Sequence, residues 1–299
     1  MQHQTSLFRG QPDNEAVKMI QYYETLALEY DPRGYCVSTS EGKDSRVLGH
    51  LFRRSGVKHF YLHSITGIDP PELIYFQRNN FQKYKDAGYL TYDVMYEKSM
   101  WQMMIEKLIP PMRNIRYCCG GFKEKRSIEQ GNAVVSLGVR KFESSNRAKN
   151  RNELEVTTSN KSNVLMPFDN DENRRTFETC YQNFEKRVNP LAYWTDADIW
   201  NYSDDVRLKQ CCLYCEGFGR LGCIGCPMTN CKKRKREFER WPGFERLYVH
   251  TFDRMIRIRK EQGLRMDFTT GREWFDWWMS DTAQKKVDEN QMLAEGWAG

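Results

Sequence analysis

The sequence predicts an α/β protein: a parallel sheet flanked by helices, then a mostly helical C-terminal part that carries a cysteine cluster. Three observations predict it. Short apolar runs of strand length alternate with amphipathic segments of helix length between residues 13 and 139. Strands joined through helices pair in parallel and are covered on both faces. Beyond about residue 145 this alternation stops, the C-terminal third is mostly helical, and six cysteines fall between residues 211 and 231.

The elements follow from local signals in chain order. Residues 13–30 carry apolar side chains at helical spacing, and the turn Asp31-Pro32-Arg33-Gly34 ends that helix. YCVST, residues 35–39, is a short buried strand, and residues after the next polar loop form a helix that ends near Gly56. The later elements expected are strands at 58–65, 90–95 and 132–139 and helices at 71–85 and 99–108.

The second half of the chain has a different character. Residues 144–163 are polar and rich in turn-forming residues, which predicts a mobile loop. We therefore divide the chain into a helical segment at 1–30, an α/β domain at 31–200 and a helical region with the cysteine cluster at 201–299.

Composition limits the class of protein. The 299 residues carry a net charge of +6 and 13% aromatic residues, which suits a protein that meets a polyanion. The stretch MQHQTSLFRG lacks the pattern of a signal peptide. No run approaches the roughly 18 apolar residues of a membrane span. We expect a cytoplasmic protein without membrane contact that could form a homo-oligomer.

The loop between the first strand and the next helix has the composition of a phosphate site. It reads Ser40-Glu41-Gly42-Lys43-Asp44-Ser45 and points backbone N–H groups and a helix N-terminus at one place. Gly42 allows close approach, Ser40 and Ser45 donate hydrogen bonds, and Lys43 adds a positive charge. The alternative is an ordinary strand-to-helix turn with a serine cap. The spacing GxxxxGK[ST] of a Walker A loop is absent.

The ten cysteines indicate metal binding or catalysis, because a reducing compartment disfavours disulfides. Cys223 and Cys226 have the CxxC spacing that brings two thiolates to one metal centre, with glycines that give the loop room. Two further ligands are required. A local set of Cys215, Cys223, Cys226 and Cys231 is sterically sensible. Cys36 and Cys180 stand alone and are expected in the core.

Several motifs together resemble a known family. SEGKDS is similar to the PP-loop SGGKDS of adenine-nucleotide α-hydrolase-like enzymes, with Glu41 in place of a glycine. Further segments resemble the phosphoadenosine phosphosulfate (PAPS) reductase-like branch of these proteins: SITGIDPPELIYF, RYCCGGFKE, LGVRKFESSNR, NPLAYWTDADIWNY and LYCEGFGRLGCIGCPM. The resemblance covers about residues 14–280 and implies a Rossmann-like domain that binds ATP with Mg²⁺.

The residues assigned to nucleotide binding lie at strand ends and in the loop. Asp69 follows the second strand and could accept hydrogen bonds from ribose or adenine, or cap the next helix. Arg140 leaves the fourth strand and can pair with phosphate oxygens. Arg147 is either a similar contact or a solvated charge. The binding set is Ser38, Ser40, Gly42, Lys43, Asp44, Ser45, Thr66, Asp69 and Arg140, in which Lys43, Ser45 and Arg140 are assigned to catalysis.

The resemblance also implies an iron–sulfur cluster, because the matching branch carries a 4Fe–4S centre; zinc is the fallback. It offers Cys118 and Cys119 from the RYCC turn, and Cys211 from the segment similar to CSLYDEGF, as partners of the CxxC pair. The chosen ligand set is Cys119, Cys211, Cys223 and Cys226. Arg116 and Lys123 are expected to be supporting anion contacts at most.

The resemblance indicates an ATP pyrophosphatase. Sulfonucleotide reductases carry a nucleophilic cysteine in a C-terminal tail, whereas this sequence has none after Cys231. The expected enzyme adenylates an acceptor for sulfur transfer, as in the DndC- and SspD-type proteins of DNA phosphorothioation. It would work with a cysteine desulfurase and other DNA-modification proteins. The alternatives are a PAPS or APS reductase with Cys215 as nucleophile, and a non-enzymatic iron–sulfur module that binds nucleic acid.

A basic run bears on the DNA assignment. Residues 232–236 read KKRKR and suit contacts with a phosphate backbone, although a solvated helix start has the same composition.

Overall fold

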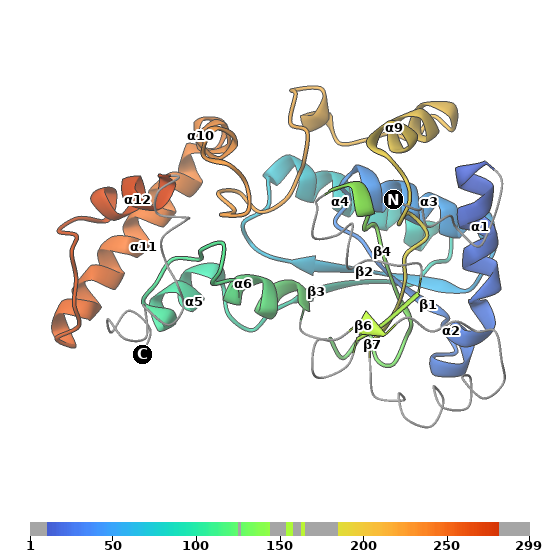
Figure 1. Ribbon diagram of the computed structural model, residues 1–299, viewed down its shortest axis with the longest axis horizontal. Coiled ribbons are helices and arrows are strands. Elements are labelled where there is room, and N and C mark those ends of the chain that lie inside the picture. Colours follow the sequence, from blue (N-terminus) through green and yellow to red (C-terminus); the bar gives the residue numbers. More distant parts are fainter. Residues whose placement is uncertain (1–10, 125–126, 144–153, 158–162, 165–184, 281–299) are drawn as a thin grey trace. The chain divides into compact units, whose positions relative to one another are not determined.

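The computed structural model describes residues 11–124, 127–143, 154–157, 163–164 and 185–280 (Figure 1). The chain forms two compact units, each built from discontinuous segments. Unit 1 comprises residues 1–63, 72–94 and 126–220, and unit 2 comprises residues 64–71, 95–125 and 221–299. Arg147 lies outside the described residues.

A seven-stranded sheet is the centre of unit 1, in the order β3-β2-β1-β4-β7-β5-β6. β1 pairs in parallel with β2 and β4, and β4 pairs in parallel with β7, which confirms the predicted Rossmann-like parallel sheet. β5 is antiparallel to both β6 and β7, so one edge is mixed. The strands are β1 (Tyr35–Ser38), β2 (His59–Ile65), β3 (Thr91–Met95), β4 (Val135–Leu137), β5 (Leu154–Thr157), β6 (Asn163–Val164) and β7 (Glu185–Val188).

One strand corrects the sequence interpretation. β5 lies inside residues 144–163, which were predicted as a loop, and it contacts β7 through a ladder in which Leu154 faces Val188. Leu154 is buried. The four residues Leu-Glu-Val-Thr alternate apolar and polar side chains as a strand does, but the polar flanks conceal this short signal.

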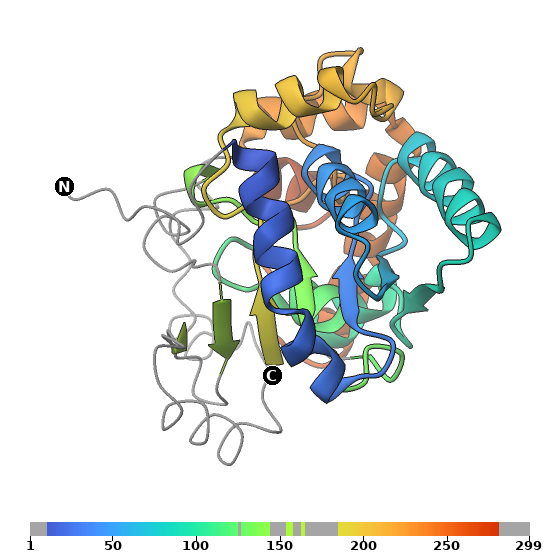
Figure 2. The same ribbon diagram turned by 90° about the vertical axis from the view of Figure 1, so that its right-hand side faces the viewer.

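Helices of unit 1 pack beside the sheet. They are α1 (Pro12–Tyr22), α2 (Glu24–Tyr30), α3 (Lys43–Ser55), α4 (Pro71–Asp86) and α9 (Asp196–Asp205). α3 packs against α1 and α9 (Figure 2). The single helix predicted for residues 13–30 is divided at Tyr23, which joins α1 to α2.

The helix after the loop is amphipathic, as predicted. Val47, Leu48, Leu51 and Phe52 are completely buried against the sheet side of the core. α3 ends at Gly56, whose φ of 74° is a left-handed conformation that glycine adopts without strain. The apolar face therefore holds the N-terminus of α3 in place at the end of β1.

Unit 2 is helical. Its helices are α5 (Met100–Lys107), α6 (Tyr117–Cys119), which continues into a π-helical turn at Gly120–Glu124, α10 (Cys231–Arg240), α11 (Pro242–Glu261) and α12 (Gly271–Met279). α11 packs against α5, α10 and α12. Trp274, Phe275 and Trp278 are buried around Tyr248 and Phe252, so these aromatic residues serve packing. Among the described helices, none combines the length and apolar character that crossing a bilayer requires.

A buried histidine makes the stability of unit 1 depend on pH. His59 is 8% exposed, and burial lowers its pKa to about 4 although Nδ1 lies 2.9 Å from the Val57 carbonyl oxygen. An unfolded histidine titrates near 6.5, so the unfolded chain binds more protons between the two values and stability falls as the pH falls through that window. We expect a loss of about 3 kcal/mol at pH 4 from this group.

The measurement is the free energy of urea unfolding between pH 4 and 7.5 for wild type and His59→Asn. The variant lacks the titrating ring, so its stability should decline less over this range. Parallel curves for the two proteins would rule out His59 as the source.

Candidate functional site

The predicted phosphate loop is a strand–loop–helix turn in unit 1. β1 ends at Ser38 and α3 begins at Lys43, with Gly42 as its N-cap in an extended conformation, φ −72° and ψ 165°. Gly42 supplies no capping side chain, and the N–H groups of the first turn have no intrahelical partner. The described turn therefore has the backbone arrangement of an anion site.

Glu41, which stands where the PP-loop pattern SGGKDS has a glycine, has a backbone conformation that favours glycine. Its φ is 55°, in the left-handed region, whereas Gly42 is extended. A Cβ at Gly42 would lie at ordinary contact distance, 3.5 Å, from Ser40 Oγ and from Tyr214 Oη. The residue with the strained backbone conformation is therefore Glu41, and the contacts of its side chain stabilise that conformation.

The Glu41 side chain points into the unit, where it is 1% exposed. Thr39 Oγ1 donates to one carboxylate oxygen at 3.0 Å, and Asn80 Nδ2 and Arg46 Nη1 donate to the other at 2.8 and 3.4 Å. Burial raises the pKa of Glu41, and Arg46 with the two hydrogen bonds opposes that rise. Glu41 therefore connects the loop to α3 and α4 on the side of the loop that faces the interior of unit 1.

We expect Glu41→Gln to destabilise the protein by about 3 kcal/mol at pH 8, because it leaves the buried Arg46 guanidinium without its carboxylate. Urea unfolding of both proteins measures the change. Glu239→Gln is the matched control, since Glu239 is exposed on α10 and should shift stability by less than about 0.5 kcal/mol. Equal stability of Glu41→Gln and wild type would contradict a structural role for the buried pair.

Four charged side chains meet at the mouth of the loop. Lys43 Nζ lies 2.6 Å from Asp196 Oδ1 and 3.3 Å from Asp44 Oδ1. Arg140 donates from Nε to Asp44 Oδ1 at 2.6 Å and from Nη2 to Asp196 Oδ1 at 2.9 Å. The two cations are buried, whereas the Asp196 side chain is 63% exposed.

Asp196 is a site residue that the sequence interpretation missed. Partial burial raises the pKa of this carboxyl, but the hydrogen bonds and charges of Lys43 and Arg140 more than offset that and lower it. The exposed Asp196 carboxylate therefore accepts hydrogen bonds from both Lys43 and Arg140, the two cations that were assigned to phosphate binding. The sequence signals that could have found it are its place at the start of α9 and the family-like segment NPLAYWTDADIWNY that contains it.

The serines of the predicted set are placed differently from one another. Ser45 is buried and its Oγ donates to the Gly42 carbonyl at 3.0 Å, which closes the first turn of α3. Ser40 is exposed and Ser38 is half-buried. Only Ser40 therefore offers an exposed hydroxyl from the loop.

Tyr214 is the second missed residue. Its hydroxyl accepts a hydrogen bond from the Lys43 backbone N–H at 2.8 Å, and its ring packs edge-on against Trp200 with centroids 5.3 Å apart. Burial raises the pKa of Tyr214. Tyr214 is separated from the loop by about 170 residues of sequence, so no local pattern connects the two.

The remaining nucleotide candidates, Thr66 and Asp69, belong to unit 2. Thr66 is buried, and its hydroxyl donates to Asp69 Oδ2 at 2.6 Å while it accepts from the Ile68 N–H at 3.3 Å. The pair closes the turn between β2 and α4.

Four thiols of unit 2 form a second candidate site: Cys118, Cys119, Cys223 and Cys226. The Cys118 thiol hydrogen-bonds to Cys119, which lowers the pKa of Cys119 and raises that of Cys118; Arg116 also lowers the pKa of Cys119. Charges on Cys223 and Cys226 act on Cys118. Burial raises the pKa of Cys223 to about 11. Among the described residues, no three His, Cys, Asp or Glu side chains already have metal-binding geometry.

The turn that carries the CxxC pair requires its glycine. Gly225 has φ 74°, and a Cβ there would lie 2.5 Å from the Phe238 ring. Lys123 lies beside these thiols, and the Cys223 charge raises the pKa of its ammonium group. This cation is suited to balance thiolate charge.

The predicted ligand Cys211 belongs to unit 1. It is 1% exposed and its thiol interacts with that of Cys212, while burial raises its pKa to about 11. Cys212 and Cys215 are exposed free thiols of the same unit, and Cys231 is half-buried at the start of α10.

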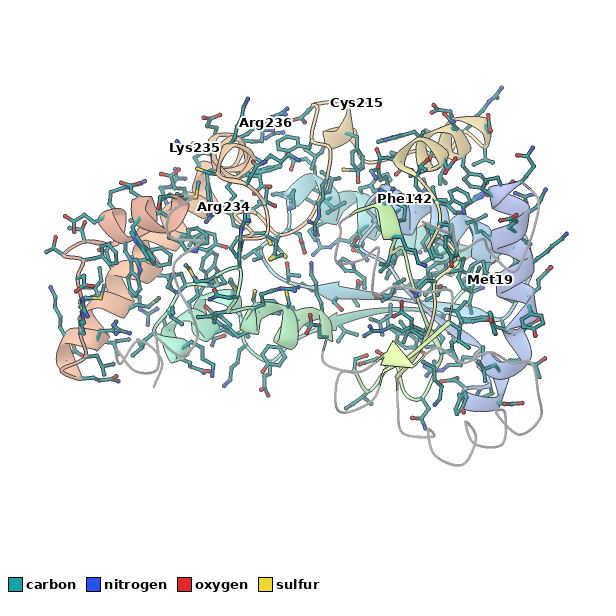
Figure 3. The ribbon with its side chains drawn as sticks, in the orientation of Figure 1. Met19, Phe142, Cys215, Arg234, Lys235 and Arg236 are labelled. Atoms are coloured by element: carbon teal, nitrogen blue, oxygen red, sulfur yellow. The ribbon has the colours of Figure 1, made fainter. Side chains whose placement is uncertain are left out.

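The basic run is divided between core and surface. Arg234 is 1% exposed, with its guanidinium carbon 3.9 Å from the centroid of the Trp278 ring and Nη1 donating to the Trp278 carbonyl at 3.1 Å. Burial lowers its pKa to about 10. The four other residues, Lys232, Lys233, Lys235 and Arg236, are exposed and form what we call the α10 basic face; Figure 3 labels two of them and Arg234. Burial removes Arg234 from the part of the basic run that a phosphate backbone could contact.

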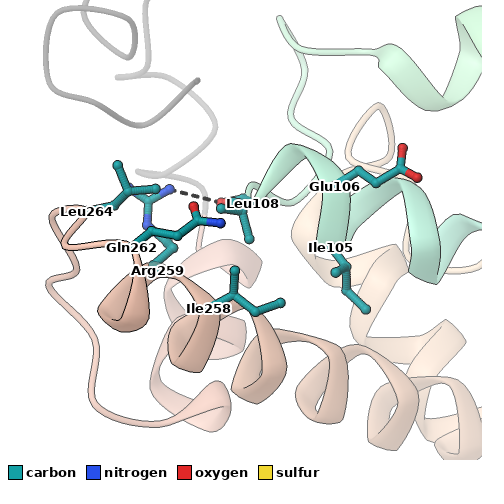
Figure 4. A pocket seen from close by; sticks show the side chains of 7 residues that line it. All are labelled: Ile105, Glu106, Leu108, Ile258, Arg259, Gln262 and Leu264. Carbon is teal, nitrogen blue, oxygen red and sulfur yellow. Dashed lines mark hydrogen bonds between the residues drawn. The ribbon is translucent and has the colours of Figure 1, made fainter.

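Unit 2 also contains a pocket of 450 Å³ between α5 and α11 (Figure 4). It is lined by Ile105, Glu106, Leu108, Ile258, Arg259, Gln262 and Leu264. The buried Arg259 donates to the carbonyls of Leu108, the C-cap of α5, and Arg265, in the segment after α11, so its guanidinium holds these two segments together. The lining includes none of the residues assigned to nucleotide or metal.

Comparisons with known proteins agree with the motifs. Residues 34–229 match the phosphoadenosine phosphosulfate reductase domain family. Two curated relatives come from Methanocaldococcus jannaschii. The uncharacterized protein MJ0973 is 26% identical over 245 residues, and MJ0066 is 28% identical over 167 residues. These alignments cover 79% and 51% of the chain but only 50% and 29% of the relatives, so the chain spans half or less of their length.

Three solved structures have a similar fold. The phosphoadenylyl-sulfate reductase of Candida auris is 15% identical, with a TM-score of 0.44 over 73% of this chain and 98% of that one. The U34-tRNA thiolase NcsA of Methanococcus maripaludis, with its [4Fe-4S] cluster, is 14% identical, with a TM-score of 0.43 over 86% and 82%. The FMN adenylyltransferase of Candida glabrata is 16% identical, with a TM-score of 0.45 over 72% and 61%.

Proposed function

Because the chain belongs to the phosphoadenosine phosphosulfate reductase domain family, we propose that it is an ATP pyrophosphatase that activates an acceptor for sulfur transfer. The observation that carries the proposal is the charge arrangement at the loop. Lys43 and Arg140 both reach one oxygen of Asp196 at the N-terminus of α3. A polyphosphate placed at the same position would meet two cations and the helix N-terminus together.

In the proposed reaction the loop holds the β- and γ-phosphates of ATP, which enters as its magnesium complex. An acceptor oxygen attacks the α-phosphorus, the bond between the α- and β-phosphates breaks, and pyrophosphate leaves. Lys43 and Arg140 stabilise the charge that develops on the leaving group, and their carboxylate partners must release them. A sulfur donor then displaces AMP from the adenylated acceptor.

We infer that the thiols of unit 2 supply the ligands of an iron–sulfur cluster, and to do so they must draw closer together, because no three described side chains already have metal-binding geometry. Cys118, Cys119, Cys223 and Cys226 supply four sulfur donors within one unit, and Gly225 lets the CxxC turn close. The family resemblance favours a 4Fe–4S cluster over zinc for such a donor set. When bound, the cluster would supply iron that binds sulfur or carries electrons. Lys123 would balance its negative charge.

DNA is the proposed acceptor, with a cysteine desulfurase and other DNA-modification proteins as partners. The α10 basic face supports it, because four exposed cations within five residues suit a phosphate backbone. The cheapest test supplies purified protein with ATP and DNA or with PAPS. Pyrophosphate release supports the proposal, sulfite release identifies a sulfonucleotide reductase, and neither product would leave a nucleic-acid-binding module.

We expect affinity for DNA to fall steeply with salt, and replacement of Lys232, Lys233 and Lys235 by Ser to flatten the log–log slope by about two to three. For each phosphate contact that is lost, fewer counterions are released when the protein binds DNA. These lysine side chains do not distinguish one base from another. Salt titration of DNA binding measures the slope. The control replaces Lys58, Lys83 and Lys85, which are exposed in unit 1, by Ser and removes the same charge elsewhere.

Identical slopes for the two triple variants would show that net charge alone acts. Wild type without salt-dependent DNA binding would argue against a direct DNA acceptor.

A further inference from the structure

Two cysteines near the phosphate loop have no part in the function proposed above. Cys212 and Cys215 are free, exposed thiols in unit 1, on the short 3₁₀ turn Cys212–Tyr214 and directly after it. In the family pattern CSLYDEGF the matching positions are serine and aspartate, so the pair is a departure of this chain.

The turn holds the two residues at a separation that a disulfide spans. The Cys215 N–H donates to the Cys212 carbonyl at 2.9 Å, and the Glu216 N–H donates to the same oxygen at 3.3 Å. In a 3₁₀ turn, side chains three positions apart lie on the same side. The Cα atoms at the ends of such a turn are within about 7 Å, and disulfides join Cα atoms that are roughly 4.4–6.8 Å apart.

The neighbouring Cys211 is a poor competitor for this bond. Its side chain is 1% exposed, so a dissolved oxidant cannot reach it as it can reach the other two. It is also adjacent to Cys212 in sequence, which would force a strained ring if those two were joined.

The residue between the thiols connects them to the nucleotide loop. Tyr214 precedes Cys215 directly, and its hydroxyl accepts from the Lys43 N–H at 2.8 Å. Leu213 is fully buried, and Tyr214 belongs to the same short turn, so a change in the backbone of the turn acts on Tyr214. The Lys43 N–H is one of the donors that the proposed phosphate site offers.

We propose that Cys212 and Cys215 are an exchange-active dithiol that closes to an intramolecular disulfide, and that Tyr214 links its state to the phosphate loop. One thiolate attacks a small disulfide, R–S–S–R, to form a mixed disulfide and release one thiol. The second thiolate attacks the protein sulfur of that mixed disulfide, forms the Cys212–Cys215 bond and releases the second thiol. The two cysteine protons end on the released thiols, so the pair is oxidised and the small disulfide is reduced. The link to nucleotide rests on the proposed function, whereas the disulfide does not.

The test equilibrates the full chain anaerobically with mixtures of reduced and oxidised glutathione, followed by peptide mass spectrometry. We expect a peptide with a Cys212–Cys215 crosslink that has lost two hydrogens. It should be absent in Cys212→Ser and Cys215→Ser and retained in Cys211→Ser. Persistence of both thiols at every glutathione ratio, or a crosslink that contains Cys211, would overturn the dithiol.

The link through Tyr214 has its own readout. Hydrogen exchange of the loop amides around Lys43 should differ between reduced and oxidised protein, and ATP affinity should change by about threefold to tenfold, the value of one hydrogen bond. Tyr214→Phe should form the same disulfide but lose both responses. Loop amides that exchange at the same rate in reduced and oxidised protein would refute the link. If the disulfide forms and loop exchange responds to it, but the protein does not bind ATP, then only the proposed function is refuted.

Discussion

Lys43→Ala is expected to lower ATP-dependent pyrophosphate release by about 100- to 1,000-fold, the cost of removing one preorganised charge from a site that develops negative charge. The physical reason lies in the geometry of the loop. The Lys43 side chain is 6% exposed at the N-terminus of α3, where Asp196 and Asp44 hold it, and it meets the leaving pyrophosphate once these carboxylates release it. Removing it leaves Arg140 as the remaining cation of the four-residue cluster.

The measurement is steady-state pyrophosphate release at saturating and at limiting ATP. Lys58→Ala is the matched control, because Lys58 is exposed in the same unit and is not one of the four charged residues of the loop cluster. Far-ultraviolet circular dichroism of both variants checks that the fold is retained. Wild-type release from Lys43→Ala would remove the phosphate-loop hypothesis, and loss of activity in both variants would trace the effect to something other than the loop.

Replacing any one of Cys118, Cys119, Cys223 or Cys226 by Ser is expected to remove most of the iron from anaerobically purified protein. Each would supply one thiolate to the proposed cluster, and serine does not replace a thiolate as a ligand. Iron and sulfide content and the visible absorption of the brown protein measure the loss. This ligand set differs from the one predicted from sequence by Cys118 in place of Cys211.

Cys211→Ser and Cys212→Ser are the matched controls, since both residues belong to the other unit. They should keep wild-type iron and colour. Bleaching by Cys211→Ser with retention in Cys118→Ser would restore the set predicted from sequence. A colourless wild type that holds zinc would replace the cluster with a structural zinc site.

Local patterns were sufficient for most of the sheet. The apolar run 35–39 and the helical spacing of Val47, Leu48 and Leu51 identified β1 and α3, because burial and hydrogen bonding of a single element depend on its own periodicity. The same rule failed at β5. That strand has only four residues and is stabilised by its pairing with β7, which no window around it contains.

The candidate site shows the same division. The loop composition indicated a phosphate site and placed Lys43 and Ser45 at the start of a helix, since the signal is contained in six consecutive residues. It did not show that Glu41 would hold the left-handed position. That depends on Asn80 and Arg46, which reach it only in the folded unit.

By itself, the sequence determined the parallel α/β core and the family, and it indicated a phosphate loop at residues 40–45, because each of these signals lies in contiguous residues. The tertiary structure decided which side chains complete the sites. Tyr214 and Asp196 contact Lys43 although more than 150 residues separate each of them from it in the sequence. Arg234 is buried, unlike its neighbours in the basic run, because its guanidinium packs against the Trp278 ring. Such contacts arise from the packing of distant segments, which brings together groups that no periodicity or spacing relates.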